Sequence, residues 1–345
     1  MNNKAGIGSF FHQVNADDLV DFNLNEFIPK FKLFYTGRHA IKFIIDEIKL
    51  TKDISKIWLP NYYCQHVTSW LKKCYSNIYF YEIDPFSNAE NLDLNTFSNP
   101  RDIVILNNFW GIYNYNIPTS KAKAIFIEDH SHGWQSTNCL NSNADYCVAS
   151  LRKTLPIPLG GILWQPNSNK NYKNNLIEDF DFYENWRKIK LAMHLKSDFI
   201  RNKNDDKSKF LDLINQSEQY LHKQYSPIKL SKENEELILR FLNKDYQIYK
   251  KDNLKFLLKN LKLNKKFKVL NSKIDCTFGL QLVFKNREDF NEVKKTLITK
   301  DIYPSELWPN NKERDDLSYL LNIHIDFRYN LKHMQHITTT INTIP

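Results

Sequence analysis

The sequence predicts an α/β protein with a large domain, built on a mostly parallel sheet with helices on both faces, and a smaller C-terminal α/β domain. Three observations support this fold class. Short apolar segments alternate with segments of helical periodicity through the first half of the chain. The apolar segments are nearly continuous, as expected of strands buried on both faces. The 345 residues, 42% of them hydrophobic, suffice for one substantial core and a second, smaller one.

The first half of the chain predicts an arm, two helices and a series of strands. Residues 1–35 are rich in aromatic side chains, and we expect them to pack as an arm on the main body and on a second subunit. A helix is predicted from Gly37, with Thr36 as its N-cap, because apolar side chains recur at helical spacing from Ile41 to Ile48. A second helix covers residues 67–74, and the predicted strands span residues 57–60, 78–83, 102–107, 124–128, 146–149 and 162–164.

Polar or aromatic loops follow four of these strands. They span residues 60–64, 107–111 and 129–133, together with the loop that carries Lys153. In open α/β sheets, ligands bind outside the carboxyl ends of the strands. We therefore expect these four loops to share one site.

The second half of the chain predicts helices followed by a second α/β unit. Residues 178–263 have helical character, and most of their charges belong on solvated helix faces. Strands at 267–270 and 279–284, a helix at 287–298 and a terminal helix from about Lys332 follow. Between these helices, residues 302–309 form an aromatic and proline-rich loop expected to face a substrate. The predicted domains are 1–235 and 236–345.

Composition narrows the classes of function. The formal net charge of +9 permits anionic partners, but the lysines are scattered and no RNA-binding or zinc-finger spacing occurs, so nucleic acid is not a predicted partner. Neither a signal peptide nor an apolar run of bilayer-spanning length appears, which predicts a cytoplasmic protein without membrane insertion. The cysteines contain no CxxC pair, and neither a metal site nor a disulfide framework is predicted. They are Cys64, Cys74, Cys139, Cys147 and Cys276.

Lys153 is the first candidate for chemistry. It lies in a loop between two predicted strands, after Ser150 and before Gly160 and Gly161. A lysine in a protected turn can lose its proton and attack a carbonyl as the free amine. Taken alone, a structural or solvent-exposed role is the more common one for such a lysine.

Upstream residues change this interpretation, because together they match the needs of pyridoxal phosphate. That cofactor needs a lysine for an imine, a carboxylate at the ring nitrogen, an anion site for the phosphate and a group covering the ring. Asp129 suits the ring nitrogen, and His132 suits the ring hydroxyl. By themselves, Asp129 and His132 also fit a hydrogen-bonded loop at a strand end. The phosphate candidates are Thr36, Gly37 and Ser150, and the ring-covering candidates are Tyr62, Tyr63 and Cys64.

The order of these motifs resembles the DegT/DnrJ/EryC1/StrS family of pyridoxal-phosphate-dependent sugar aminotransferases, which have the aspartate aminotransferase fold. The resemblance covers nearly the whole chain, and its most specific part is Glu128-Asp129-x-x-His132 followed by Lys153. The other matching elements are Thr36-Gly37-Arg38-x-Ala40, Pro60-x-Tyr62-x-Cys64, Ser150-x-x-Lys153, Gly160-Gly161, Asn253 and Asp326-Phe327-Arg328-Tyr329.

The resemblance implies roles for these residues. Lys153 would be the Schiff-base lysine and proton shuttle, Asp129 the partner of the pyridine nitrogen, and His132 a neighbour of the cofactor. Gly37, Arg38 and Ser150 would face the phosphate. It also implies a homodimer with active sites at the subunit interface. An amino donor, commonly glutamate, would supply an amine to a keto-sugar, nucleotide-linked, for surface polysaccharide biosynthesis.

The sequence departs from the family pattern at three points. Ser150 and Lys153 are three residues apart, where the family has five. The position of the ring-stacking aromatic falls at Cys64, and a His-x-Tyr-Gly motif is replaced by Asn108-Phe109-Trp110-Gly111. Two alternatives therefore stay open: a sugar dehydratase-like enzyme, which would carry histidine in place of Lys153, and a catalytically silent scaffold in polysaccharide assembly.

Overall fold

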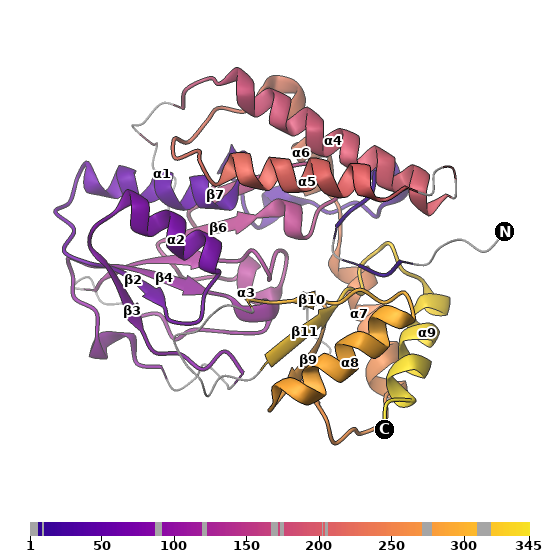
Figure 1. Cartoon of the computed structure of the whole chain (residues 1–345). Helices are drawn as coiled ribbons and strands as arrows, with labels where there is room; N and C mark the ends of the chain where they lie inside the picture. The colour runs from indigo at the N-terminus through magenta and orange to yellow at the C-terminus, as the bar shows by residue number, and fades with distance from the viewer. Residues whose placement is uncertain are drawn as a thin grey trace.

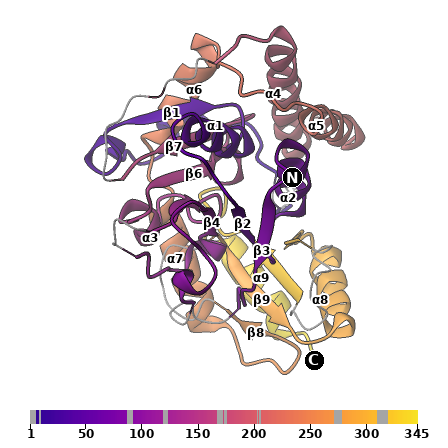
Figure 2. The same ribbon diagram turned by 90° about the vertical axis from the view of Figure 1, so that its left-hand side faces the viewer.

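The computed structural model describes residues 6–8, 10–86, 92–118, 123–166, 172, 176–201, 203, 206–270, 278–308 and 319–345. A seven-stranded sheet and a four-stranded sheet each carry a hydrophobic core (Figure 1). Helices α4 and α5 lie at one end of the molecule, and α8 and α9 lie at the other (Figure 2). Cys276 and Pro309, named in the sequence predictions, lie outside the described residues.

The large sheet has the strand order β1-β7-β6-β5-β4-β2-β3, and its central pairs are parallel. The prediction of a mostly parallel sheet is confirmed. Only β7 runs antiparallel to its neighbours β6 and β1. The strands are β1 (Phe31–Phe34), β2 (Ile57–Pro60), β3 (Ile78–Tyr81), β4 (Ile103–Asn107), β5 (Ile125–Asp129), β6 (Tyr146–Ser150) and β7 (Gly161–Trp164).

The strand β1 differs from the sequence prediction, which assigned residues 31–34 to an arm. It pairs with β7 with Phe34 opposite Gly161, and the chain then enters α1 (Gly37–Lys49). A Cβ atom added at Gly161 would lie 2.3 Å from the carbonyl oxygen of Thr36. Glycine is therefore required where the β1–α1 connection crosses β7.

The remaining helices and the small sheet follow along the chain. The two remaining helices of the parallel half are α2 (Gln65–Cys74) and the short α3 (Thr137–Leu140). Helices α4 (Phe180–Ile200) and α5 (Ser208–Leu221) pack on each other, and α6 (Lys232–Leu242) and α7 (Gln247–Asn260) follow. The four-stranded sheet consists of β8 (Lys268–Val269), β9 (Leu280–Phe284), β10 (Ser305–Glu306) and β11 (Tyr319–Ile323), with α8 (Arg287–Thr299) and α9 (Leu331–Asn342).

The change from one core to the other falls between Tyr246, which packs in the first, and Leu254, which packs in the second. The division into domains at residue 235 stays a prediction. Of the described helices, none has both the length and the apolar character that crossing a membrane requires.

The amino-terminal segment joins the two cores. Ile7 belongs to the second core, and its carbonyl accepts a hydrogen bond from the backbone of Tyr303 at 2.7 Å. A few residues later, the carbonyl of Phe10 accepts from Arg328 Nη1 at 3.0 Å, and the Arg328 guanidinium lies over the ring of Phe11. The segment thus packs on the main body, as expected of the arm, while contact with a second subunit stays a prediction.

Candidate active site

A cavity of about 660 Å³ lies at the carboxyl edge of the large sheet, and residues on or next to both sheets line it. Of the residues that the sequence proposes for catalysis or cofactor binding, all but the ring-covering candidate Tyr62 line this cavity. They are Thr36, Gly37, Arg38, Tyr63, Cys64, Asp129, His132, Ser150 and Lys153. The four strand-end loops therefore converge as expected. The roles of the individual residues stay predictions.

Lys153 is the last residue of a short 3₁₀ helix, Leu151–Lys153, that directly follows β6. Its Nζ lies 3.3 Å from Nε2 of His132, which the chain places at the end of a different strand, β5. The side chain is half-buried and reaches the cavity. A primary amine thus faces a space large enough for a small organic ligand.

Asp129 ends β5 and is 6% exposed. Its Oδ1 accepts a hydrogen bond from the backbone N–H of Ser131 at 2.9 Å, and its Oδ2 accepts one from the Tyr63 hydroxyl at 2.5 Å. Ser131 Oγ in turn accepts from the backbone N–H of Ser150 at 2.8 Å. The carboxylate is therefore fixed, and its loop is tied to the strand that leads to Lys153.

The His132 ring lies among three aromatic rings. The centroid of the His132 ring lies 4.4 Å from that of Phe278, 5.1 Å from that of Trp308 and 5.4 Å from that of Trp110, and all three pairs are stacked. Burial, followed by the charge of Lys153, lowers the pKa of His132 well below its ordinary value. The ring is therefore neutral, and its Nε2 can accept a hydrogen bond from the lysine.

Both tryptophans beside His132 have unusual backbone conformations. Trp110 has φ 58° and Trp308 has φ 53°, in the left-handed region that bulky side chains rarely adopt. Such conformations persist where surrounding packing imposes them, and they are common near functional sites. Trp110 lies in one of the four loops predicted to share a site, and it replaces the tyrosine of a family motif. Trp308 lies in the loop expected to face a substrate, and residues 305–308 of that loop line the cavity.

The start of α1 lies directly against the end of β6. A Cβ atom added at Gly37 would lie 3.0 Å from both the backbone nitrogen and the Cβ of Ser150. Thr36 caps the helix as predicted, because its Oγ1 accepts a hydrogen bond from the His39 N–H at 3.3 Å. Helix N–H groups that lack partners, next to a glycine, form an anion site.

Arg38 adds a buried positive charge at this helix start. It is 8% exposed, and its Nη1 donates to His222 Nδ1 at 3.4 Å. Within the described part of the chain, no carboxylate lies within ion-pair distance of Arg38, whereas the neighbouring Arg152 pairs with Glu218. Burial, followed by the charge of Arg152, lowers the pKa of Arg38. Arg38 and Arg152 thus have one carboxylate near them, that of Glu218, which leaves a positive charge at this end of the cavity for an anionic ligand to neutralise.

The small sheet supplies a polar wall. Ser305 lies in the segment predicted as a substrate-facing loop, where the structure has the short strand β10, whereas His324 was not predicted. Ser305, on β10, lines the cavity, and its Oγ lies 2.8 Å from Nε2 of the buried His324, which also lines it. Burial, followed by the charge of Arg328, lowers the pKa of His324 to about 3. A neutral histidine therefore orients a hydroxyl group toward the cavity.

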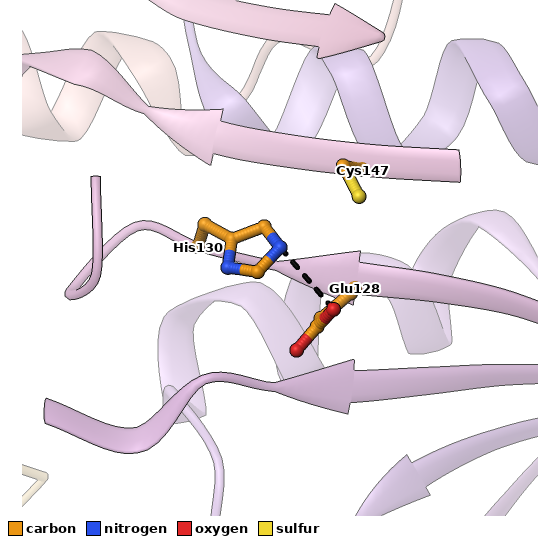
Figure 3. A group of neighbouring side chains, drawn as sticks. All are labelled: Glu128, His130 and Cys147. Atoms are coloured by element: carbon orange, nitrogen blue, oxygen red, sulfur yellow. Dashed lines mark ion pairs between the residues drawn. The ribbon is translucent and has the colours of Figure 1, made fainter. Parts of the chain in front are cut away.

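A second polar cluster occupies the core between β5 and β6 (Figure 3). Glu128, His130 and Cys147 are buried, with possible ligand atoms all within 4.8 Å of one another. Ser142 Oγ donates to Glu128 Oε2 at 2.6 Å, and the Cys147 thiol donates to Ser142 Oγ at 3.2 Å. His130 Nε2 lies 3.3 Å from Glu128 Oε2, and its Nδ1 is 3.0 Å from Asn108 Nδ2. Burial raises the pKa of Cys147 well above its usual range. These groups therefore form a hydrogen-bonded link between the strands, and the absence of a metal site stays a prediction.

Comparison with known proteins identifies the fold. No family model matches the chain, and no curated protein matches its sequence. Among solved structures, the sugar aminotransferase CalS13 of Micromonospora echinospora has a TM-score of 0.62 at 13% identity, covering 98% of this chain and 100% of the other. Helicobacter pylori PseC, an aminotransferase of pseudoaminic acid biosynthesis, has a TM-score of 0.60 at 13% identity, over 97% and 98% of the two chains. Spr1654 of Streptococcus pneumoniae, in its PMP form, has a TM-score of 0.59 at 12% identity, over 98% and 97%. The predicted fold class is confirmed: the chain has the α/β fold of these aminotransferases, over nearly its whole length.

Proposed function

We propose that this protein is a pyridoxal-phosphate-dependent aminotransferase. It transfers an amino group from an amino acid, glutamate, to a nucleotide-linked keto-sugar for surface polysaccharide biosynthesis, and it acts as a cytoplasmic homodimer. The observation that carries the proposal is the convergence of Lys153, Asp129 and the start of α1 on one cavity. The structural neighbours CalS13 and PseC, described as aminotransferases, support the same reaction class.

The residues present fit the cofactor. The uncompensated charge of Arg38 and the close packing of Gly37 on Ser150 suit a phosphate at the start of α1. Asp129 offers a fixed carboxylate for a protonated ring nitrogen, and Lys153 offers the amine. Spr1654, which has the same fold, is described in PLP and PMP forms. When bound, the cofactor acts as an electron sink that makes a proton on the substrate carbon removable.

The chain's own part in this reaction is to bind, orient and move a proton. Lys153 Nζ is the group that carries the proton, because the lowered pKa of His132 makes that ring a poor base. His132 instead accepts a hydrogen bond and holds the Nζ in place. Its three aromatic neighbours fix the ring plane and exclude water from this side.

A spectrum tests the proposal. Wild type and Lys153→Ala, each supplied with pyridoxal phosphate, are compared in the near-ultraviolet and visible range, with Lys188→Ala, a change at an exposed site on α4, as control. We expect a band of lysine-bound cofactor in wild type and control, fixed on Lys153 by borohydride and found there by mass spectrometry. Lys153→Ala should lack both the band and the adduct.

Two outcomes decide against the proposal. If neither wild type nor variant binds the cofactor, the scaffold alternative replaces the enzyme. If wild type binds the cofactor but does not release 2-oxoglutarate from glutamate, a glutamate-dependent aminotransferase is ruled out. Screening of keto-sugars follows only after a positive result in both measurements.

A further inference from the structure

The hydroxyl of Tyr63 makes a short, fully buried hydrogen bond that sequence analysis did not foresee. Tyr63 lies in the loop after β2, and Asp129 lies at the end of β5, with β4 between these strands in the sheet. The two side chains are 2% and 6% exposed, and the Tyr63 Oη to Asp129 Oδ2 distance is 2.5 Å. The tyrosine thus reaches across the carboxyl end of one strand to contact the carboxylate.

The direction of this hydrogen bond follows from burial and charge. Burial, followed by the charge of Asp129, raises the pKa of Tyr63 well above its ordinary value, so the phenol keeps its proton and donates it. The Ser131 N–H donates to Oδ1 and the Tyr63 hydroxyl donates to Oδ2, so that each oxygen of Asp129 has a donor. Donors on both oxygens fix the orientation of the carboxylate.

The orientation of the tyrosine is also fixed. Its ring makes an edge-to-face contact with Trp308, with centroids 6.0 Å apart, and the phenol lies among buried groups at the carboxyl edge of the sheet. A carboxylate oxygen accepts more than one hydrogen bond. Asp129 can therefore keep its bond to Tyr63 and still accept a donor that enters from the cavity.

We propose that Tyr63 is a positioning residue for Asp129: its hydroxyl holds the carboxylate where it can accept a hydrogen bond from a protonated ring nitrogen on a bound pyridine. This inference rests on the proposed function. It assigns the hydroxyl of Tyr63 a role separate from covering the ring face. Since the hydroxyl acts through Asp129, its removal should matter only for ligands that use the ring nitrogen.

A binding comparison tests this inference without any measurement of turnover. The ligands are pyridoxal phosphate and its 1-deaza analogue, in which a C–H replaces the ring nitrogen, and the readout is the ratio of their dissociation constants. The variant is Tyr63→Phe, which keeps the ring. The matched control is Tyr246→Phe, because Tyr246 is also buried but lies outside the cavity, and its hydroxyl donates to the carbonyl of Phe241. In Tyr63→Phe we expect the preference for pyridoxal phosphate to fall roughly 2- to 12-fold, the value of one hydrogen bond, with no change in Tyr246→Phe.

The result that overturns the inference is an unchanged ratio in Tyr63→Phe, even if both ligands bind more weakly, because packing alone would then explain the loss. A wild type that binds both ligands equally would overturn the assigned role of Asp129, and with it the proposed function. An Asp129→Asn background gives a second measurement, in which adding Tyr63→Phe should leave the ratio unchanged. If it still lowers the ratio, Tyr63 does not act through Asp129, and the inference is wrong. Urea unfolding of each protein verifies that it is folded.

Discussion

Replacement of Arg38 should change stability and ligand binding in opposite directions. A buried ion without a counter-ion destabilises a folded protein. Arg38 is 8% exposed, and no described carboxylate pairs with it. Arg38→Met keeps a long, flexible apolar side chain. We expect it to raise the free energy of unfolding of the ligand-free protein by about 1–3 kcal/mol, as when buried charges are replaced by apolar groups.

The same change should weaken the binding of a phosphate group. A hydrogen bond to a charged partner contributes about 1.5–3 kcal/mol, which corresponds to a loss of roughly 10- to 150-fold in affinity. Urea unfolding of the ligand-free protein measures the first effect. Fluorescence titration with pyridoxal phosphate and with inorganic phosphate measures the second.

Arg152→Met is the matched control, because Arg152 lines the same cavity but has a partner. It pairs with Glu218, and the two side chains are 27% and 31% exposed. Solvent screens such a pair, so its loss should cost at most about 1 kcal/mol, and it should destabilise the protein. If Arg38→Met also destabilises and leaves phosphate affinity at the wild-type value, the argument from uncompensated charge is refuted.

Three further changes have defined outcomes. Gly37→Ala forces a Cβ against Ser150 and should lower the free energy of unfolding by about 1–3 kcal/mol in urea, with weaker phosphate binding. In Gly161→Ala the added Cβ would lie 2.3 Å from the Thr36 carbonyl oxygen, and this backbone atom cannot move aside as a flexible side chain can. Size-exclusion chromatography should therefore recover little folded protein. His39 is fully buried, and burial lowers its pKa to about 3. A lowered histidine pKa means that the unfolded chain binds the extra proton below pH 6.5, so stability falls as the pH falls from 6.5 toward 3. Between pH 7 and pH 5, the free energy of unfolding of His39→Phe should therefore fall by about 2 kcal/mol less than that of wild type, as measured by urea unfolding at each pH. An equal fall in both proteins would show that His39 does not remain neutral in the folded state.

The parallel half of the fold could be predicted from sequence because its strands are short apolar runs between helices with an apolar face. Three strands escaped prediction: the two-residue β10, which lies in a segment predicted as a loop, and β1 and β11, which were missed for different reasons. In β1, only half of the residues are fully buried, and its partner β7 is distant in the chain. In β11, a buried polar residue interrupts the apolar pattern: Asn322 Oδ1 accepts from Gln281 Nε2 on the neighbouring strand at 2.8 Å. A polar pair satisfied across two strands is not visible in either strand alone.

Some features of the candidate site could likewise be predicted from sequence, and others could not. Lys153, Asp129, His132 and the start of α1 follow from motifs at strand ends, where topology alone brings loops together. The pairing of Arg152 with Glu218, and the hydroxyl that Ser305 presents, depend on packing between segments far apart in sequence. No local sequence pattern predicts that Arg152, rather than Arg38, forms an ion pair with a carboxylate.

The position of His132 depends on segments next to both sheets. Trp110 belongs to the loop after β4, whereas Phe278 and Trp308 come from segments next to β9 and β10 of the small sheet. The backbone N–H of Phe278 donates to the carbonyl of Trp110 at 2.7 Å, which joins the two sides of this aromatic contact directly. A fragment that ends before Phe278 would lack two of the three rings and leave the His132 imidazole open to water. The pKa of His132 would then rise toward the ordinary value, because burial is the main cause of its low value. The neutral state of the ring beside Lys153 is therefore a property of the packing between the two sheets, and such a fragment should not retain it.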